Sequence, residues 1–207
     1  MTILSSNKKT GVSLNFTRAD CRPTTTCLKC CYGKAHYLGN GKAALAKWAR
    51  NSQYLATTPD CKELIVEARA FSAVRISGIG DIIPKQVPNL IKLAKACPGT
   101  QFWGMTRKPE LAKKLNGRLP NLRMLVTVDA TSPQSVWDTY DGRLCYGPRR
   151  AEDKVPRDKR LVTVFPYHAS GKVVGNVPTH ALDCPAVRHK VSGCLECTRC
   201  WTWAMYG

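Results

Sequence analysis

The sequence predicts an α/β fold, an open partial (β/α) barrel built on a parallel sheet. Strand-like and helix-like segments alternate along most of the chain, an order that gives right-handed βαβ units and parallel neighbouring strands. Leu122–Val128 is almost continuously apolar, as expected for a strand that is covered on both faces. The 207 residues leave room for about five or six units, whereas a closed eight-unit barrel usually takes about 250 residues.

The predicted strands are short apolar or β-branched runs. In chain order they are Val12–Phe16, Ala73–Ser77, Gln101–Thr106, Leu122–Val128 and Leu161–Phe165. We expect a charged, proline-containing loop over Gly147–Arg160, before the last of these strands.

The predicted helices lie between these strands and carry apolar residues at helical spacing. They cover Lys42–Leu55, a segment that begins after Asp60, Gln86–Ala96, a short helix opened by Pro109, and Ser132 to about Tyr140. Asp60 with Glu63 three residues later is a helix-start signal, and proline favours the first position of a helix.

Composition limits the location and the number of domains. No run of about 18 uncharged apolar residues is present, which excludes a membrane span. Residues 1–16 lack the apolar core of a signal peptide, so we expect a cytoplasmic protein. The chain divides into a predicted barrel with an N-terminal cysteine loop, residues 1–165, and a Cys-rich C-terminal segment, residues 166–207.

The protein is strongly basic, with 32 Lys and Arg against 14 Asp and Glu and a net charge of +18. The net charge is +7 over residues 1–60, +7 over 61–130 and +4 over 131–207, so the excess is spread along the chain. Spread positive charge favours encounter with polyanions such as RNA, DNA or a ribosome. The alternative is a soluble protein that is merely basic.

Eleven cysteines are present, and eight of them form two groups near the chain ends. An odd number, in a chain without a secretion signal, argues against a disulfide framework and favours metal binding. Cys61, Cys97 and Cys145 are isolated, and we expect them to be packing thiols.

The C-terminal group contains Cys184, Cys194, Cys197 and Cys200. Its last three members form an uninterrupted C-x2-C-x2-C run, which is the spacing of ferredoxin-type iron–sulfur loops, and Cys184 could supply the fourth ligand. Structural zinc usually takes two separated C-x2-C pairs, but a zinc site with Cys184 or His189 as the outlying ligand is the alternative.

The N-terminal group contains Cys21, Cys27, Cys30 and Cys31, and three of these thiols could hold a cluster. Cys30 and Cys31 are adjacent, so we expect one of them to be a ligand and the other a packing residue; spacing alone does not distinguish them. Three protein ligands on a four-iron cluster leave one iron open for chemistry.

Further candidate residues follow the predicted strands. Gly78-Ile79-Gly80-Asp81 follows the second strand, Arg107 and Lys108 follow the third, and Asp129 follows the fourth. The carboxyl ends of parallel strands open onto one edge, which is where ligands bind in such folds. The glycines would let the backbone approach a ligand, Asp81 could bind an ammonium or ribose hydroxyl, and the cations could bind a carboxylate or phosphate.

Together these pieces resemble the radical S-adenosylmethionine enzymes, in particular a phage-encoded set of that type. The matching stretches are Cys21…Cys27…Cys31-Tyr32, Arg75 to Asp81, Phe102 to Pro109, and Cys194…Cys197…Cys200-Trp201. In the first loop the gap between the first two cysteines is five residues where the family has three, and Asp81 stands where the enzymes commonly have Glu.

The resemblance implies one or two [4Fe–4S] clusters and S-adenosylmethionine as a second cofactor. The first loop would ligate one cluster, Ser77, Gly78, Gly80 and Asp81 would contact the cofactor, and the C-terminal cysteines would hold a second cluster. It also implies a reductant protein as electron donor and, for a phage protein, the host cytoplasm as location.

Two functions remain open at this point. In the first, the protein is an enzyme that splits S-adenosylmethionine, with Asp81, Arg107, Lys108 and Asp129 in catalytic roles toward a nucleic acid or nucleotide. In the second, the metal sites only stabilise a basic scaffold that binds RNA, DNA or a host complex.

Overall fold

The computed structural model describes residues 2–7, 10–31, 33, 41–166, 168–169, 172–173, 178–188 and 190–202. Its centre is a seven-stranded sheet in which the strands lie in the order of the sequence, β1 to β7. The first strand pairs antiparallel with the second, and every following neighbour pairs parallel. The chain is therefore α/β with a mostly parallel sheet that does not close into a barrel in the described part of the chain, as the sequence predicts.

The strands of this sheet are β1 (Ser5–Asn7), β2 (Gly11–Leu14), β3 (Ala73–Ile76), β4 (Gln101–Thr106), β5 (Leu122–Val128), β6 (Leu144–Arg149) and β7 (Leu161–Pro166). A separate antiparallel pair consists of β8 (His168–Ala169) and β9 (Lys172–Val173). All five strands predicted from the sequence are present, and the bounds of β4 and β5 are those expected.

The longer helices connect the parallel strands. They are α3 (Gly41–Thr57), α4 (Lys62–Ala68), α5 (Val87–Ala96), α6 (Pro109–Leu115) and α7 (Gln134–Thr139). Their apolar side chains share one core with alternate residues of the strands, among them Leu64, Leu90, Leu111, Val74, Phe102 and Val126. This core lies between the helices and one face of the sheet.

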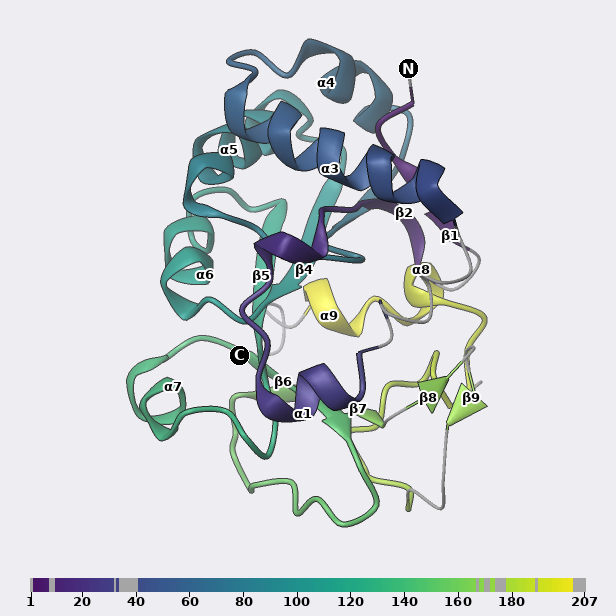
Figure 1. The fold of residues 1–207 in the computed structure, drawn as a ribbon, viewed down its shortest axis with the longest axis vertical. Coiled ribbons are helices and arrows are strands. Elements are labelled where there is room, and N and C mark those ends of the chain that lie inside the picture. Colours follow the sequence, from purple (N-terminus) through teal and green to yellow (C-terminus); the bar gives the residue numbers. More distant parts are fainter. Residues whose placement is uncertain are drawn as a thin grey trace.

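Side chains of the opposite face are more polar. Arg75, Thr127 and Cys145 belong to strands β3, β5 and β6 but are absent from the apolar core, whereas their neighbours along each strand belong to it. Two short helices of the C-terminal segment, α8 (Cys194–Cys197) and α9 (Arg199–Thr202), complete the tail. Helix α9 contacts β4, β5 and β7, so the tail covers this polar face (Figure 1).

The tail is also tied to the edge of the sheet. Val164 of β7 forms a parallel bridge with Asp183, and the Cys184 amide donates to the Val164 carbonyl over 2.7 Å. The Asp183 carboxylate lies 3.5 Å from Arg149 of β6 and 2.6 Å from Arg188. The division at residues 165 and 166 stays a prediction, but the described tail packs directly on the sheet.

Two strands of the seven-stranded sheet were not expected. The first, β1, has three residues, which is too short for a periodic pattern. The second, β6, contains Gly147 and Pro148 within the region that the sequence indicates is a loop. The strand pairing shifts register between Tyr146 and Arg149, so glycine and proline lie at an irregularity where ladder hydrogen bonds are interrupted.

Helix starts follow the sequence only in part. Pro109 occupies the first turn of α6 as expected. Helix α4, in contrast, is preceded by Cys61, which has a left-handed backbone (φ 48°) and makes no side-chain capping bond. Glu63 accepts a hydrogen bond from the Tyr54 hydroxyl over 2.6 Å, so the Asp60 and Glu63 pattern does not form the predicted capping box.

In the described residues, no helix is both long enough and apolar enough to cross a membrane.

Candidate metal and cofactor site

The candidate site lies at the carboxyl edge of the sheet, where the loops after β2, β3, β4 and β5 meet. The loop after β2 contains the 3-10 turn η1 (Arg18–Asp20) and the helix α1 (Thr25–Lys29). Cys21 follows the turn, Cys27 lies within α1, and Cys30 ends that helix. Thr24 caps α1 by accepting a hydrogen bond from the Cys27 amide over 3.1 Å.

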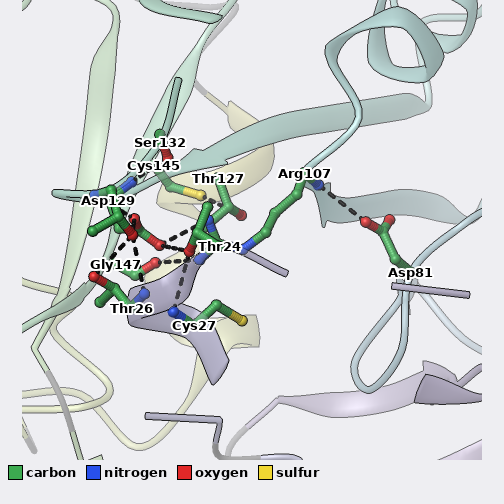
Figure 2. Close-up of polar contacts among 11 residues, drawn as sticks. Thr24, Thr26, Cys27, Asp81, Arg107, Thr127, Asp129, Ser132, Cys145 and Gly147 are labelled. Carbon is green, nitrogen blue, oxygen red and sulfur yellow. Dashed lines mark hydrogen bonds and ion pairs between the residues drawn. The ribbon is translucent and has the colours of Figure 1, made fainter. Parts of the chain in front are cut away.

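Asp129, at the end of β5, fixes α1 in place. Its carboxylate accepts a hydrogen bond from the Thr24 hydroxyl and one from the Thr131 amide over 2.9 Å. Thr131 in turn accepts from the Thr26 amide over 3.0 Å. The cysteine helix is therefore bound at its first turn to the carboxyl end of a central strand (Figure 2).

Arg107, just after β4, is the cation at the centre of this network. Its guanidinium lies 2.9 Å from the Asp129 carboxylate, whose side chain is fully buried, and donates to the Gly147 carbonyl over 2.9 Å. Burial raises the pKa of the Cys27 thiol, and Arg107, which interacts with that thiol by charge and hydrogen bonding, opposes the shift. Arg107 therefore joins the cysteine helix to the ends of β4, β5 and β6 (Figure 2).

Lys108 connects two loops from within the protein. It is 7% exposed, and its ammonium donates to the carbonyl of Asp20 and, over 2.6 Å, to that of Ile82. Burial raises the pKa of the Cys21 thiol to about 12, while the Lys108 charge acts in the opposite direction. We assign Lys108 a positioning role, because both of these bonds hold loops together next to Cys21.

Asp81 is similarly engaged. Its two carboxylate oxygens accept hydrogen bonds from the Ile82 amide over 2.7 Å and from the Arg107 amide over 3.1 Å. Burial raises the pKa of Asp81, and bonds from Thr106 and from these amides limit the increase. The Asp81 carboxylate thus holds the backbone of Arg107 in place.

The two glycines of the loop after β3 are required by packing against the loop after β2. A side chain at Gly78 would collide with Asn15, and one at Gly80, whose φ is +78°, would collide with the Phe16 carbonyl. The Ile79 amide donates to Asn15 over 2.9 Å, and the Phe16 amide donates to the Ile79 carbonyl over 2.9 Å. The close packing of these two loops therefore accounts for both glycines, and contact of the glycines with a ligand stays a prediction.

Ser77, at the end of β3, has the two features expected of a ligand-binding position. Its backbone is left-handed (φ 57°) although it is not a glycine. Its hydroxyl oxygen is buried and has no hydrogen-bond partner among the described residues. Such strain and such an unpaired polar atom cost free energy, and both occur preferentially at functional sites.

Three thiols of the N-terminal group come together. Burial raises the thiol pKa of Cys21 and of Cys27. The charges of Cys27 and Cys31 raise the pKa of Cys21 further, and the charge of Cys31 raises the pKa of Cys27 further. The Cys31 sulfur also faces the loop after β3, because a Cβ atom at Gly33 would lie 3.5 Å from that sulfur and 3.7 Å from Ile79. We refer to Cys21, Cys27 and Cys31 as the front thiols.

Cys30 points elsewhere. Burial raises its thiol pKa, and the largest charge effects on that pKa come from Arg150, Asp153 and Glu152, in the loop after β6. The two adjacent cysteines, Cys30 and Cys31, thus face different loops. The sequence spacing alone does not distinguish them.

The C-terminal cysteines gather on the polar face of the sheet. Burial raises the pKa of Cys184, Cys194 and Cys200, and each of these shifts also includes charges of other thiols from the group. The Arg75 guanidinium, 5.2 Å above the Trp103 ring, opposes the shift at all three. We refer to Cys184, Cys194, Cys197 and Cys200 as the tail thiols; His189, the alternative zinc ligand, lies outside the described residues.

Both donor sets consist of thiols, which are the ligands of iron–sulfur clusters in proteins. In the part of the chain that the structure describes, no three Cys, His, Asp or Glu side chains form a group that could hold a metal ion. Cations lie beside both sets, Lys108 and Arg107 beside the front thiols and Arg75 beside the tail thiols, and their charge favours the thiolate form that binds metal.

Sequence reasoning missed several residues that build this site. Thr24, Thr26 and Thr131 hold the cysteine helix, and Arg75 lies among the tail thiols. The Thr-Thr-Thr run before Cys27 was the available signal, since threonine favours helix N-caps. The signal at Arg75 was a charged residue within an otherwise apolar strand.

Comparison with known proteins gave one match. The model of a family described as Gene product 88 matches residues 3–202. No curated protein and no solved structure matches the chain.

The network predicts a large effect of Asp129→Ala on stability. Removal of this carboxylate leaves the Arg107 guanidinium buried without its counter-charge, which we expect to cost about 3–5 kcal/mol. Asp141→Ala is the control, because Asp141 is exposed and lies 3.6 Å from Lys113; we expect a change within about 0.5 kcal/mol. Urea unfolding of the metal-free proteins measures both, and equal unfolding free energies would contradict the assignment.

Proposed function

The chain belongs to the Gene product 88 family, a family of phage proteins, and from this premise we propose that it is an iron–sulfur enzyme that cleaves S-adenosylmethionine. The front thiols would ligate a [4Fe–4S] cluster, and the tail thiols a second cluster. One observation carries the proposal. Three thiols from one loop gather at the carboxyl edge of a parallel sheet, directly after its first parallel strand.

The topology supports the same conclusion. Strands β2 to β7 are parallel and lie in sequence order, which is the order of a (β/α) barrel that has been opened, and not that of a doubly wound sheet. Loops from consecutive strands then meet at one edge. The radical S-adenosylmethionine enzymes, which the sequence resembles, have a partial barrel of this kind with the cysteine loop after the first strand.

The cluster would have one iron without a protein ligand and, once reduced by an external donor, would supply the electron for cleavage of S-adenosylmethionine. The residues of this chain would provide the surroundings. Lys108 and Arg107 place positive charge next to Cys21 and Cys27. The unpaired Ser77 hydroxyl is a donor and acceptor at the same edge of the sheet, suited to a polar group of the cofactor.

Asp81 and Asp129 hold the backbone and side chains around the site in place. Their carboxylates bind backbone amides, hydroxyl groups and Arg107, so we propose positioning roles for both. Arg107 interacts with the Cys27 thiol by hydrogen bonding as well as by charge, so we propose that it acts directly at the front thiols.

The adjacent cysteines provide a matched test of the cluster. After anaerobic reconstitution with iron and sulfide, we expect Cys31→Ala to lose the front cluster and Cys30→Ala to retain it, because only Cys31 faces Cys21 and Cys27. The tail cluster remains in both variants, so the front signal is followed by iron and sulfide content and by electron paramagnetic resonance of the reduced protein. Equal loss in the two variants, or loss in Cys30→Ala alone, would reject this ligand set.

Cleavage of S-adenosylmethionine has its own assay. The reconstituted protein, reduced with dithionite, should release 5′-deoxyadenosine, and Cys31→Ala should release none above background. Ser77→Ala should weaken cofactor binding, with about a tenfold increase in the concentration needed for half-maximal rate if one hydrogen bond of about 1.4 kcal/mol is lost. A fully loaded front cluster that yields no 5′-deoxyadenosine would reject the enzymatic function.

The charge of the protein favours a second candidate function, binding to RNA or DNA by a metal-stabilised scaffold. The net charge is +18, and many of the cations are exposed, including Lys95 and Lys114. Binding to RNA should weaken with salt, and each of Lys95→Glu and Lys114→Glu should lower the slope of log affinity against log salt by about 1 if that residue contacts phosphate. Affinity that does not change with salt would contradict this function.

A further inference from the structure

The middle of the chain carries a large share of the positive charge. Residues 82–128 contain nine Lys and Arg against one acidic residue, Glu110, so this stretch contributes +8 to the net charge of +18. Arg107 and Lys108 belong to the candidate site, and Arg123 is partly buried. The other six cations are exposed, and we refer to them as the basic helix face: Lys85, Lys92, Lys95, Lys113, Lys114 and Arg118.

Two neighbouring helices present these cations on their outer sides. Helix α5 packs its apolar residues into the core, which leaves Lys92 and Lys95 exposed, and Lys85 lies just before its first residue. Helix α6 likewise buries its apolar residues and exposes Lys113 and Lys114. Because α5 and α6 contact each other (Figure 1), their outer sides form one continuous surface.

Acidic side chains neutralise little of this charge. Glu110 lies 3.2 Å from Arg22, in the loop after β2, and is thus paired with a cation outside the face. Lys113 lies 3.6 Å from Asp141, but both side chains are well exposed, so the pair is screened by solvent. Within the described part of the chain, the other five cations of the face form no ion pair.

Helix electrostatics accounts for only part of the pattern. Cations are favourable near the C-terminal carbonyls of a helix, which suits Lys95 in the last turn of α5 and Lys114 in the last turn of α6. Lys85 lies at the opposite end of α5, where the helix dipole disfavours a cation, and Lys92 lies in the middle of that helix. The face therefore carries more positive charge than the stability of its helices calls for.

The side chains of this face favour a nucleic-acid double helix as the partner. A helix that binds a membrane surface inserts large apolar residues, and single strands are bound by stacking on aromatic rings. Phe102 and Trp103, the aromatic residues of this stretch, are buried. The large apolar residues that are exposed in the described chain all lie outside residues 82–128: Leu28, Val66, Phe71 and Leu195.

We propose that the basic helix face binds the phosphate backbone of a double-stranded nucleic acid and does not read its bases. Lysine and arginine side chains on regular helices provide such contacts, which position a protein on a duplex without regard to sequence. The inference rests on the second candidate function above, to which it adds the surface and the form of the partner. It requires no metal, since α5 and α6 pack on the face of the sheet opposite the tail.

The test reverses three charges of the face in one variant, Lys85→Glu with Lys95→Glu and Lys114→Glu. Lys92 is left unchanged, because its ammonium donates to the Pro59 carbonyl over 2.9 Å. We expect the slope of log affinity against log salt to fall by about 3 for a DNA duplex, and the affinity at about 0.15 M salt to fall about a hundredfold. Fluorescence anisotropy with short labelled duplexes of arbitrary sequence measures both quantities.

The matched control carries the same change in net charge on other elements, as Lys42→Glu with Lys154→Glu and Lys190→Glu. These three lysines are exposed and lie in α3, in the loop after β6 and in the tail. We expect the control to change the salt slope by less than about 1. Thermal unfolding shows that each variant is folded, and unchanged release of 5′-deoxyadenosine by the reconstituted protein shows that the cluster sites are intact.

Further probes identify the partner. A DNA duplex, an RNA duplex, a single strand of the same sequence and vesicles of anionic phospholipid are compared at equal salt concentration. We expect both duplexes to bind more tightly than the single strand, and the tighter of the two identifies the nucleic acid that the face takes. Cys31→Ala should bind duplex as the unchanged protein does.

Each outcome bears on one proposal. Loss of duplex binding in the triple variant of the face, with retention in the control, supports the inference. Equal binding by the two variants overturns the inference alone and leaves nucleic-acid binding to another surface. Tighter binding to the single strand or to the vesicles overturns the assigned partner. A protein that binds no nucleic acid rejects the second candidate function together with the inference, whereas the iron–sulfur proposal keeps its own tests.

Discussion

The buried ion pair between Arg107 and Asp129 is the interaction on which the candidate site depends. Both groups lie at the carboxyl edge of the sheet, where desolvation makes an unpaired charge costly and a paired one strongly directional. The pair accounts for the position of α1, because Asp129 also binds Thr24 and Arg107 also interacts with Cys27. A loop that carries three thiols is thereby fixed to rigid strands, and this fixed placement is what a cluster site requires.

The second constraint is the difference between the two faces of the sheet. One face packs against five helices through apolar residues, and the other carries Arg75, Thr127 and Cys145 beneath the tail. In a parallel sheet both faces are usually covered by apolar side chains. Desolvation of the Arg75 charge on this face costs free energy, which is why we regard the face as part of the functional site and not as a second core.

Most regular elements could be predicted because their signals are local. Residues 101–106 and 122–128 are apolar runs with bounds that agree with the structure, and Pro109 begins a helix. Strand β6 could not be predicted, because Gly147 and Pro148 are typical of loops and are accommodated only by an irregular pairing with β7. The glycines at 78 and 80 were recognised from the sequence, and the structure adds that they allow one loop to pack on another.

The sequence by itself determined the parallel α/β class and the two groups of cysteines. It also determined which strands are followed by polar candidate residues, because periodicity and spacing are properties of neighbouring residues. Only the tertiary structure separated Cys31 from Cys30, since the direction of each thiol depends on how α1 is bound to β5 and β6. Only the tertiary structure, too, brought the C-terminal cysteines onto the sheet. Helix α9 is far along the chain from β4 and β5, and it contacts both because it packs across the sheet, which no local pattern encodes.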